Sequence, residues 1–144
     1  MITVKRIQNP AEVSLADINA LLSQLRTDAN EPGGAQADLE VIASSANIVF
    51  VVVQDGEKTI GIATAYIARK FGKTTGFVED VVVDQGYRGQ GLGEKLMSVL
   101  IEESRKAGAT KLMLTSRPHR TVAHKLYEKL GFQRKETDVF RLKL

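Results

Sequence analysis

Three glycines that follow an arginine, in the run Arg88-Gly89-Gln90-Gly91-Leu92-Gly93, are the first residues whose types and spacing could do chemistry. The run joins an apolar segment, Phe77 to Val83, to an amphipathic pattern that starts at about Leu92. Glycine leaves successive backbone N–H groups unhindered, and a helix that starts here adds the positive end of its dipole. The spacing therefore predicts a loop that binds an anionic group.

The spacing also separates this loop from two nucleotide-binding motifs. A dinucleotide-binding fingerprint requires glycine three positions after Gly91, where this chain has Glu94. A P-loop ends in Gly-Lys-Ser/Thr. In this chain Gly91 is followed by Leu92, so no lysine is in position for nucleotide phosphates. An interpretation without any ligand stays open, in which the glycines only let a strand and a helix pack closely.

Two neighbouring carboxylates, Glu79 and Asp80, interrupt the apolar run before the loop. Unpaired carboxylates are costly inside an apolar strand, so at least one of them must face a cleft or a positively charged partner. Strand alternation does not decide which of the two faces a substrate. A proton acceptor and a structural ion pair with an arginine both fit this pattern.

The composition restricts the chemistry and the partners. The 144 residues contain no cysteine, which excludes a disulfide framework, a thiolate zinc site and an acyl-cysteine intermediate, and we expect no metal. A net charge of +3 and 6% aromatic residues provide neither a broad basic stripe nor stacking platforms, so we expect no nucleic-acid partner. The chain has no apolar stretch of bilayer length and no signal-peptide pattern at its start, which favours a cytoplasmic protein without membrane association.

The remaining pattern predicts one domain over residues 1–144 and the elements that must position these residues. Alternation and the turn Asp55-Gly56 predict strands, and apolar spacings of three and four residues predict helices. Strands are expected at 2–8, 48–53, 59–69, 77–83, 111–115, from 132 onward and at 139–144, and helices at 13–25, 35–44, 92–107 and 122–130. This order indicates an α+β fold with a mixed, mainly antiparallel sheet flanked by helices.

Three separated motifs in this order resemble the GNAT superfamily, the GCN5-related N-acetyltransferases. They are Glu79 to Val83, Tyr87 to Gly93, and the run Ala123-His124-Lys125-Leu126-Tyr127-Glu128-Lys129-Leu130-Gly131-Phe132. The resemblance covers the second half of the chain directly, and the element order of the first half is compatible with it. It implies a sheet that splays open after its fourth strand, here Phe77 to Val83.

The resemblance also implies acetyl-CoA as cosubstrate. The main chain of the fourth strand would pair with the pantetheine arm as an added strand does, and the loop amides would hold the pyrophosphate. The residues implied in cosubstrate binding are Val81, Val82, Val83, Arg88, Gly89, Gln90, Gly91, Leu92, Gly93 and Glu94.

The implied reaction is acetyl transfer by direct attack of an amine in a ternary complex. Tyr127 stands where the family usually has its general acid, and a phenol can protonate a thiolate. Core packing through helical spacing is the alternative role for Tyr127. Glu79 is the candidate general base, while Asp80 and a structural ion pair stay open as alternatives.

One departure from the family pattern lies on the same helix. Relatives commonly have asparagine seven residues before the tyrosine, and this chain has Arg120. Arg120 and His119 could meet a phosphate of CoA or an acidic group of the acceptor, or form a surface cluster at a helix start. His124 is expected to be structural.

Resemblance leaves the acceptor open. The Glu79 to Val83 strand is similar to that of glucosamine-6-phosphate acetyltransferases, and the Arg120 to Tyr127 stretch to acetyltransferases of small amines. The first choice is a small primary amine, with anionic metabolites among the candidates, and the second is a protein N-terminus or lysine. A noncatalytic acyl-CoA sensor is a further alternative, and a homodimer is compatible with the family.

Overall fold

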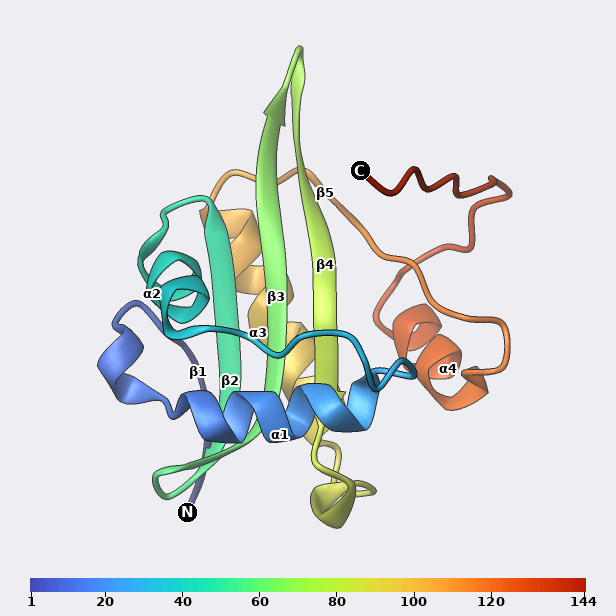
Figure 1. Cartoon of the computed structure of the whole chain (residues 1–144). Coiled ribbons are helices and arrows are strands. Elements are labelled where there is room, and N and C mark those ends of the chain that lie inside the picture. Colours follow the sequence, from blue (N-terminus) through green and yellow to red (C-terminus); the bar gives the residue numbers. More distant parts are fainter.

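The computed structural model describes all residues from 1 to 144, and Figure 1 shows the arrangement of the chain. Four strands and a short fifth strand alternate with four α-helices and two 3₁₀ turns. In chain order they are β1 (Ile2–Arg6), η1 (Pro10–Glu12), α1 (Leu15–Leu25), α2 (Gln36–Ser44), β2 (Ile48–Asp55), β3 (Lys58–Lys70), β4 (Lys73–Val83), η2 (Gln85–Tyr87), α3 (Leu92–Lys106), β5 (Lys111–Met113) and α4 (Thr121–Lys129).

The sheet has the strand order β1-β2-β3-β4-β5. The first four strands form an antiparallel meander, and β5 pairs with β4 in parallel. Tight turns close the hairpins: Gly56, with φ of 60°, follows Asp55 as its sequence pattern predicts, and Gly72, with φ of 76°, turns β3 into β4. The predicted α+β fold with a mixed, mainly antiparallel sheet is confirmed.

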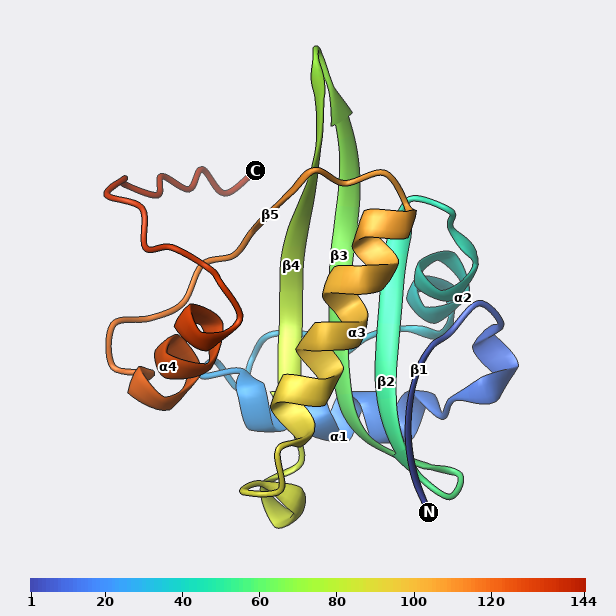
Figure 2. The ribbon, with the colours of Figure 1, turned by 180° about the vertical axis from the view of Figure 1, so that it is seen from behind.

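Helices cover both faces of the sheet. Figures 1 and 2 show α1 and α2 on one face and α3 on the other. The alternation of β2 divides its side chains between two apolar clusters: Val49 and Val51 pack with α3, whereas Phe50 and Val52 pack with α1 and α2. Burial on both faces therefore fixes the central strands, which position the candidate site.

The fourth and fifth strands touch over a short stretch and then separate. Their pairs are Thr75 with Lys111, Gly76 with Leu112 and Phe77 with Met113, and no pair follows. Beyond Phe77, β4 is paired only with β3. The sheet thus splays open after β4, as the resemblance implied.

Two predicted strands are wrong, the one from Phe132 onward and the one at Val139 to Leu144. Residues 132–144 form neither helix nor strand, and those after Phe132 are exposed. A strand needs a paired neighbour, and within this one chain the tail does not pair with the sheet. None of the helices combines the length and hydropathy that a membrane-spanning segment requires.

The contact between β4 and β5 leads to a stability prediction at Gly76. A Cβ at Gly76 would lie 2.4 Å from Leu112 Cδ2 and 3.2 Å from Ile67 Cδ1. We expect Gly76→Ala to lower the free energy of unfolding by about 1–3 kcal/mol, because an added methyl group in a packed site displaces its neighbours. Urea denaturation measures this change.

Gly86→Ala is the matched control. Gly86 is exposed, and a Cβ there would meet only Asp84 Oδ1, at 4.0 Å. Its expected change is within about 0.5 kcal/mol, as for most surface substitutions. Equal urea midpoints of unfolding for Gly76→Ala and Gly86→Ala would contradict the prediction that close packing at Gly76 excludes a methyl group.

Candidate functional site

The second half of β4 offers a free backbone edge inside the molecule. Its other edge pairs with β3, with Thr64 opposite Glu79, Ile62 opposite Val82 and Gly61 opposite Val83. The register shifts at a β-bulge between Ile62 and Thr64. Backbone groups that face the opening can accept an amide-bearing ligand as a further strand.

The bulge places Asp80 in an unusual backbone conformation. Its φ is 52°, the only positive φ among the non-glycine residues. Aspartate tolerates this left-handed region better than most residues, and bulges often redirect a side chain beside an active site. The bulge therefore decides how Glu79 and Asp80 are directed, which strand alternation left open.

The glycine loop lies between the end of β4 and the start of α3. Gly89 has φ of 81°, and Gly91 has φ of 73° and caps α3 in the left-handed conformation. A Cβ at either position would meet no atom within 4 Å. The first N–H groups of α3, from Leu92 to Glu94, have no partner within the helix. The loop is an open cradle of amides at a helix start, as its sequence predicts.

Side chains from distant elements hold this loop. Arg88 Nε donates a hydrogen bond to the Val83 carbonyl (3.2 Å), and Gln85 N donates to Gln24 Oε1 (2.9 Å). Lys129 Nζ of α4 contacts Glu94 Oε2 at 2.9 Å. Arg88 and Glu94 thus make structural contacts that tie the loop to β4 and α4, besides any contact with an anion.

A cleft of about 420 Å³ opens where β4 and β5 separate. Glu79 lines it from β4, Tyr127 from α4, and Leu112 from β5. Residues of the tail, Arg134 and Val139 among them, also line it. The structure therefore brings both predicted catalytic side chains to one cavity, whereas Val81 to Glu94 lie beyond its lining.

Burial raises the pKa of the Tyr127 phenol above its ordinary value, while the positive charge of Arg120 acts in the opposite direction. The ring of Tyr127 packs edge-to-face on Phe132, with 5.8 Å between centroids. Both predicted roles of Tyr127, packing and proton donation, are thus compatible with its position. A phenol with a raised pKa stays protonated at neutral pH and can act as a proton donor.

The two carboxylates of β4 also have raised pKa values. For Glu79, an exposed residue, the first cause is partial desolvation, and the second is the charge of Asp80. For Asp80 the first cause is burial, which Arg26 opposes and Glu31 reinforces. Glu79 is thus a carboxylate of increased basicity on the cleft wall.

Sequence reasoning missed the residues that surround Asp80. Tyr66 lies opposite Phe77 on β3, and burial together with Asp80 raises its pKa. Arg26 Nε lies 3.4 Å from Glu31 Oε2, and both belong to the connection between α1 and α2, which crosses in front of β3 and β4 in Figure 1. No local motif marks these residues, since only the tertiary fold brings them to β4.

The basic residues at the start of α4 are exposed. His119 and Arg120 both lie on the surface, and Arg120 is close enough to Tyr127 to influence its pKa. His124 Nε2 lies 3.2 Å from Ser116 Oγ, and both residues line the cleft. The hydrogen bond between α4 and the segment that follows β5 agrees with the structural role expected for His124.

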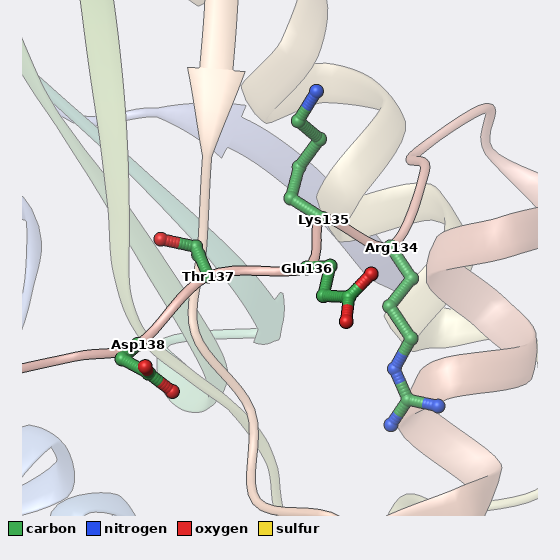
Figure 3. A pocket seen from close by; sticks show the side chains of 5 residues that line it. All are labelled: Arg134, Lys135, Glu136, Thr137 and Asp138. Atoms are coloured by element: carbon green, nitrogen blue, oxygen red, sulfur yellow. The ribbon is translucent and has the colours of Figure 1, made fainter.

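A second hollow is lined by five consecutive residues of the tail, Arg134 to Asp138. Figure 3 shows their side chains pointing in different directions rather than toward a common centre. No group of three or more histidine, aspartate or glutamate side chains is arranged to hold a metal ion. The cleft between β4 and α4 therefore remains the candidate site.

Comparison with known proteins places this geometry in context. A model of the acetyltransferase (GNAT) family matches residues 18–132. A glucosamine 6-phosphate N-acetyltransferase of Trypanosoma brucei brucei is 40% identical over 103 residues, which are 69% of this chain and 67% of that protein. A probable glucosamine 6-phosphate N-acetyltransferase of Oryza sativa subsp. japonica is 34% identical over 127 residues, 81% of this chain and 74% of that protein. The crystal structure of a Trypanosoma brucei acetyltransferase has a TM-score of 0.77 at 34% identity, with 100% of both chains covered.

The open cradle leads to a binding prediction at Gly91. We expect Gly91→Ala to weaken CoA binding by about tenfold, because the methyl group would enter the space above the amides and strain a left-handed residue. Isothermal titration calorimetry with CoA measures the dissociation constant. Gly108→Ala is the control. Gly108 has φ of 99° and lies at the opposite end of α3, so its alanine variant has the same kind of backbone strain but places no methyl group above the loop amides. Equal weakening in both variants would contradict the prediction.

Proposed function

The chain belongs to the acetyltransferase (GNAT) family, and from this we propose that it transfers the acetyl group of acetyl-CoA to the primary amine of a small metabolite. Family membership identifies an acetyl-CoA-dependent N-acetyltransferase, so the alternative of a noncatalytic sensor is not retained. The observation that carries the proposal is the meeting of Glu79 and Tyr127 on one cleft beside the free edge of β4.

The residues present fit acetyl-CoA, which supplies a thioester as acetyl donor when bound. The edge of β4 that faces away from β3 is not paired with β5 from Val81 to Val83, and it is suited to the amides of a pantetheine arm, although the Val83 carbonyl already accepts a hydrogen bond from Arg88. The open cradle at Gly89 and Gly91, with the start of α3, is suited to a pyrophosphate. These two features lie in sequence along β4 and its loop, in the order that an extended ligand needs.

Glu79 and Tyr127 would divide the proton transfers between them. An amine attacks only when neutral, so the Glu79 carboxylate would accept a proton from the ammonium form, directly or through a water molecule. As the new C–N bond forms and the C–S bond breaks, the Tyr127 phenol would donate its proton to the sulfur, and the second proton lost by the nitrogen would pass through solvent to restore the phenol. Direct transfer needs no enzyme nucleophile, which agrees with a chain that has no cysteine.

An amino sugar phosphate is the acceptor class that the relatives favour. Two relatives, 40% and 34% identical over more than two thirds of this chain, are named as a glucosamine 6-phosphate N-acetyltransferase and a probable one. Arg134 and Lys135 line the cleft from the tail and could pair with an anionic group of the acceptor. Glu79 on the opposite wall would face the amine.

An acceptor panel tests this proposal. The purified chain is incubated with acetyl-CoA and glucosamine 6-phosphate, glucosamine, a short peptide with a free N-terminus, or a lysine peptide, and thiol release is followed. We expect the phosphorylated sugar to have the highest kcat/KM and the peptides to be poor acceptors. A higher kcat/KM for a peptide would overturn the small-metabolite proposal. Similar kcat/KM values for glucosamine and glucosamine 6-phosphate would contradict the proposal that the acceptor is anionic.

Removal of the Tyr127 hydroxyl tests the acid. We expect Tyr127→Phe to lower kcat by about 10²-fold or more, as is usual for loss of a general acid, with little change in CoA affinity. The phenylalanine keeps the packing on Phe132, so thermal denaturation should show a folded protein. Unchanged turnover would leave Tyr127 with the packing role alone.

The pH profiles of two variants distinguish the role of Glu79 from that of Asp80. We expect Glu79→Gln to lower kcat/KM by about 10²-fold or more throughout. Asp80→Asn removes the charge that raises the pKa of Glu79, so the acid limb of kcat/KM should move to lower pH while the plateau stays high. Asparagine also tolerates the left-handed backbone at position 80.

The direction of the shift in the acid limb follows from the role of Glu79 as a base. A base works when deprotonated, so activity falls as the pH drops through its pKa, and a lower pKa extends activity to more acidic pH. The titration of the amine is common to wild type and variant and does not contribute to the difference. Loss of the plateau in Asp80→Asn, with Glu79→Gln active, would assign the base to Asp80.

A further inference from the structure

The chain between the end of β4 and the start of α3 lacks the packing that holds the rest of the fold. None of the residues from Asp84 to Gly91 is buried, and the short turn η2 in this stretch contributes no buried side chain. Two of its residues, Gly89 and Gly91, have positive φ, and glycine restricts the backbone less than any other residue. Polar contacts must therefore hold this segment in one conformation.

The backbone amides of this segment fall into two groups. Every amide from Asp84 to Tyr87 donates a hydrogen bond within the chain: Asp84 N to the Ile60 carbonyl (2.8 Å), Gln85 N to Gln24 Oε1 (2.9 Å), Gly86 N to Asp84 Oδ1 (3.2 Å) and Tyr87 N to the Asp84 carbonyl (2.9 Å). The amides from Arg88 to Gly91 donate to no backbone carbonyl of the chain. Tyr87 thus marks the boundary between amides that hold the segment and amides that are available to a ligand.

Gln24, an exposed residue in the last turn of α1, holds the start of η2 with both ends of its side-chain amide. Its Oε1 accepts the hydrogen bond from Gln85 N, and its Nε2 donates to Asp84 Oδ1 at 3.2 Å. The same Asp84 oxygen accepts from Gly86 N. One side chain of α1 therefore fixes the direction in which the chain leaves β4.

Tyr87 is held from the turn between β2 and β3. Its hydroxyl donates a hydrogen bond to Asp55 Oδ2 at 2.8 Å, and its ring packs against the apolar cluster that α3 forms with the sheet. The hydrogen bond to the Asp55 carboxylate raises the pKa of the Tyr87 phenol, so the phenol keeps its proton and remains the donor. Asp55 therefore sets the position of the last residue before the free amides.

We propose that Gln24 and Asp55 are positioning residues for the cosubstrate, which act through η2 to hold the amides from Gly89 to Gly91 in the arrangement that binds a pyrophosphate. This inference rests on the proposed function, since the pyrophosphate is that of acetyl-CoA. Without the two contacts, the segment would become ordered only when the ligand binds, and this ordering would lower the affinity. Neither side chain needs to touch the cosubstrate itself.

Isothermal titration calorimetry with CoA measures the effect of each contact. Gln24→Ala removes both hydrogen bonds to the start of η2, and Tyr87→Phe removes the bond to Asp55 but keeps the ring. We expect each variant to weaken CoA binding about three- to tenfold, the usual effect of losing one hydrogen bond. Gln36→Ala is the matched control, because Gln36 is an exposed glutamine at the start of α2, and it is expected to bind CoA as the wild type does.

Two variants of Asp55 test whether it acts through Tyr87. Asp55→Asn keeps a side-chain oxygen that can accept the hydrogen bond, and it is expected to bind CoA with nearly the wild-type affinity. Asp55→Ala is expected to lose as much affinity as Tyr87→Phe. The double variant Asp55→Ala/Tyr87→Phe is expected to lose no more than either single variant, because both substitutions remove the same hydrogen bond. Additive losses would overturn the assignment of Asp55.

A cosubstrate without a pyrophosphate distinguishes positioning of the loop from a general effect on the fold. S-acetylpantetheine has the thioester and the pantetheine arm but no phosphate. We expect Gln24→Ala and Tyr87→Phe to raise the KM for acetyl-CoA about three- to tenfold with unchanged kcat. The kcat/KM for S-acetylpantetheine is expected to stay at the wild-type value. Equal losses with both cosubstrates would overturn the proposal.

NMR order parameters of the Gly89 and Gly91 amides, measured without any ligand, test the contacts independently of the function. We expect these order parameters to fall from about 0.85 in the wild type toward about 0.6 in Gln24→Ala and Tyr87→Phe. Unchanged order parameters, or a CoA affinity equal to that of the wild type, would overturn the proposal. A wild type that binds no CoA, with order parameters that still fall in the variants, would refute the proposed function and support the holding of the loop by Gln24 and Asp55.

Discussion

The separation of β4 from β5 after Phe77 is the constraint on which the site depends. Inside a sheet, backbone N–H and C=O groups are normally paired on both sides, and a strand with one free edge needs another partner. Here the free edge lies in the interior of the fold, between β4 and α4, rather than at the rim of the sheet. An extended amide ligand can occupy it, and the glycine loop lies at its end.

The opening keeps its shape because β4 is held from the other side. Nine residues of β4 pair with β3, against three with β5, and apolar clusters pack on both faces of the central strands. Gly76 lets β5 approach closely before the strands part. The backbone N–H and C=O groups of β4 and the first N–H groups of α3 are therefore already in place before a ligand binds, which lowers the entropy cost of binding.

The order of the elements up to α4 and the glycine loop could be predicted from sequence because their signals are local, whereas the assignment of Tyr127 as acid and Glu79 as base depended on the resemblance to a family. Glycine spacing, the Asp55-Gly56 turn and helical periodicity each depend on neighbouring residues. Tyr66 and Arg26 could not be predicted, since they reach Asp80 only through tertiary packing. The tail was predicted as strands on alternation alone, and alternation cannot supply the neighbour that a strand requires.

The same physical effect acts on the two groups that we propose as base and acid, Glu79 and Tyr127. Desolvation raises the pKa of Glu79 and of Tyr127, because burial disfavours the charged form of each. For the carboxylate this increases basicity toward an ammonium proton, and for the phenol it preserves the proton that a leaving thiolate needs. The charge of Asp80 raises the pKa of Glu79 further. A single partly closed cleft thus disfavours the charged form of both groups, which is the property that the proposed base and the proposed acid each require.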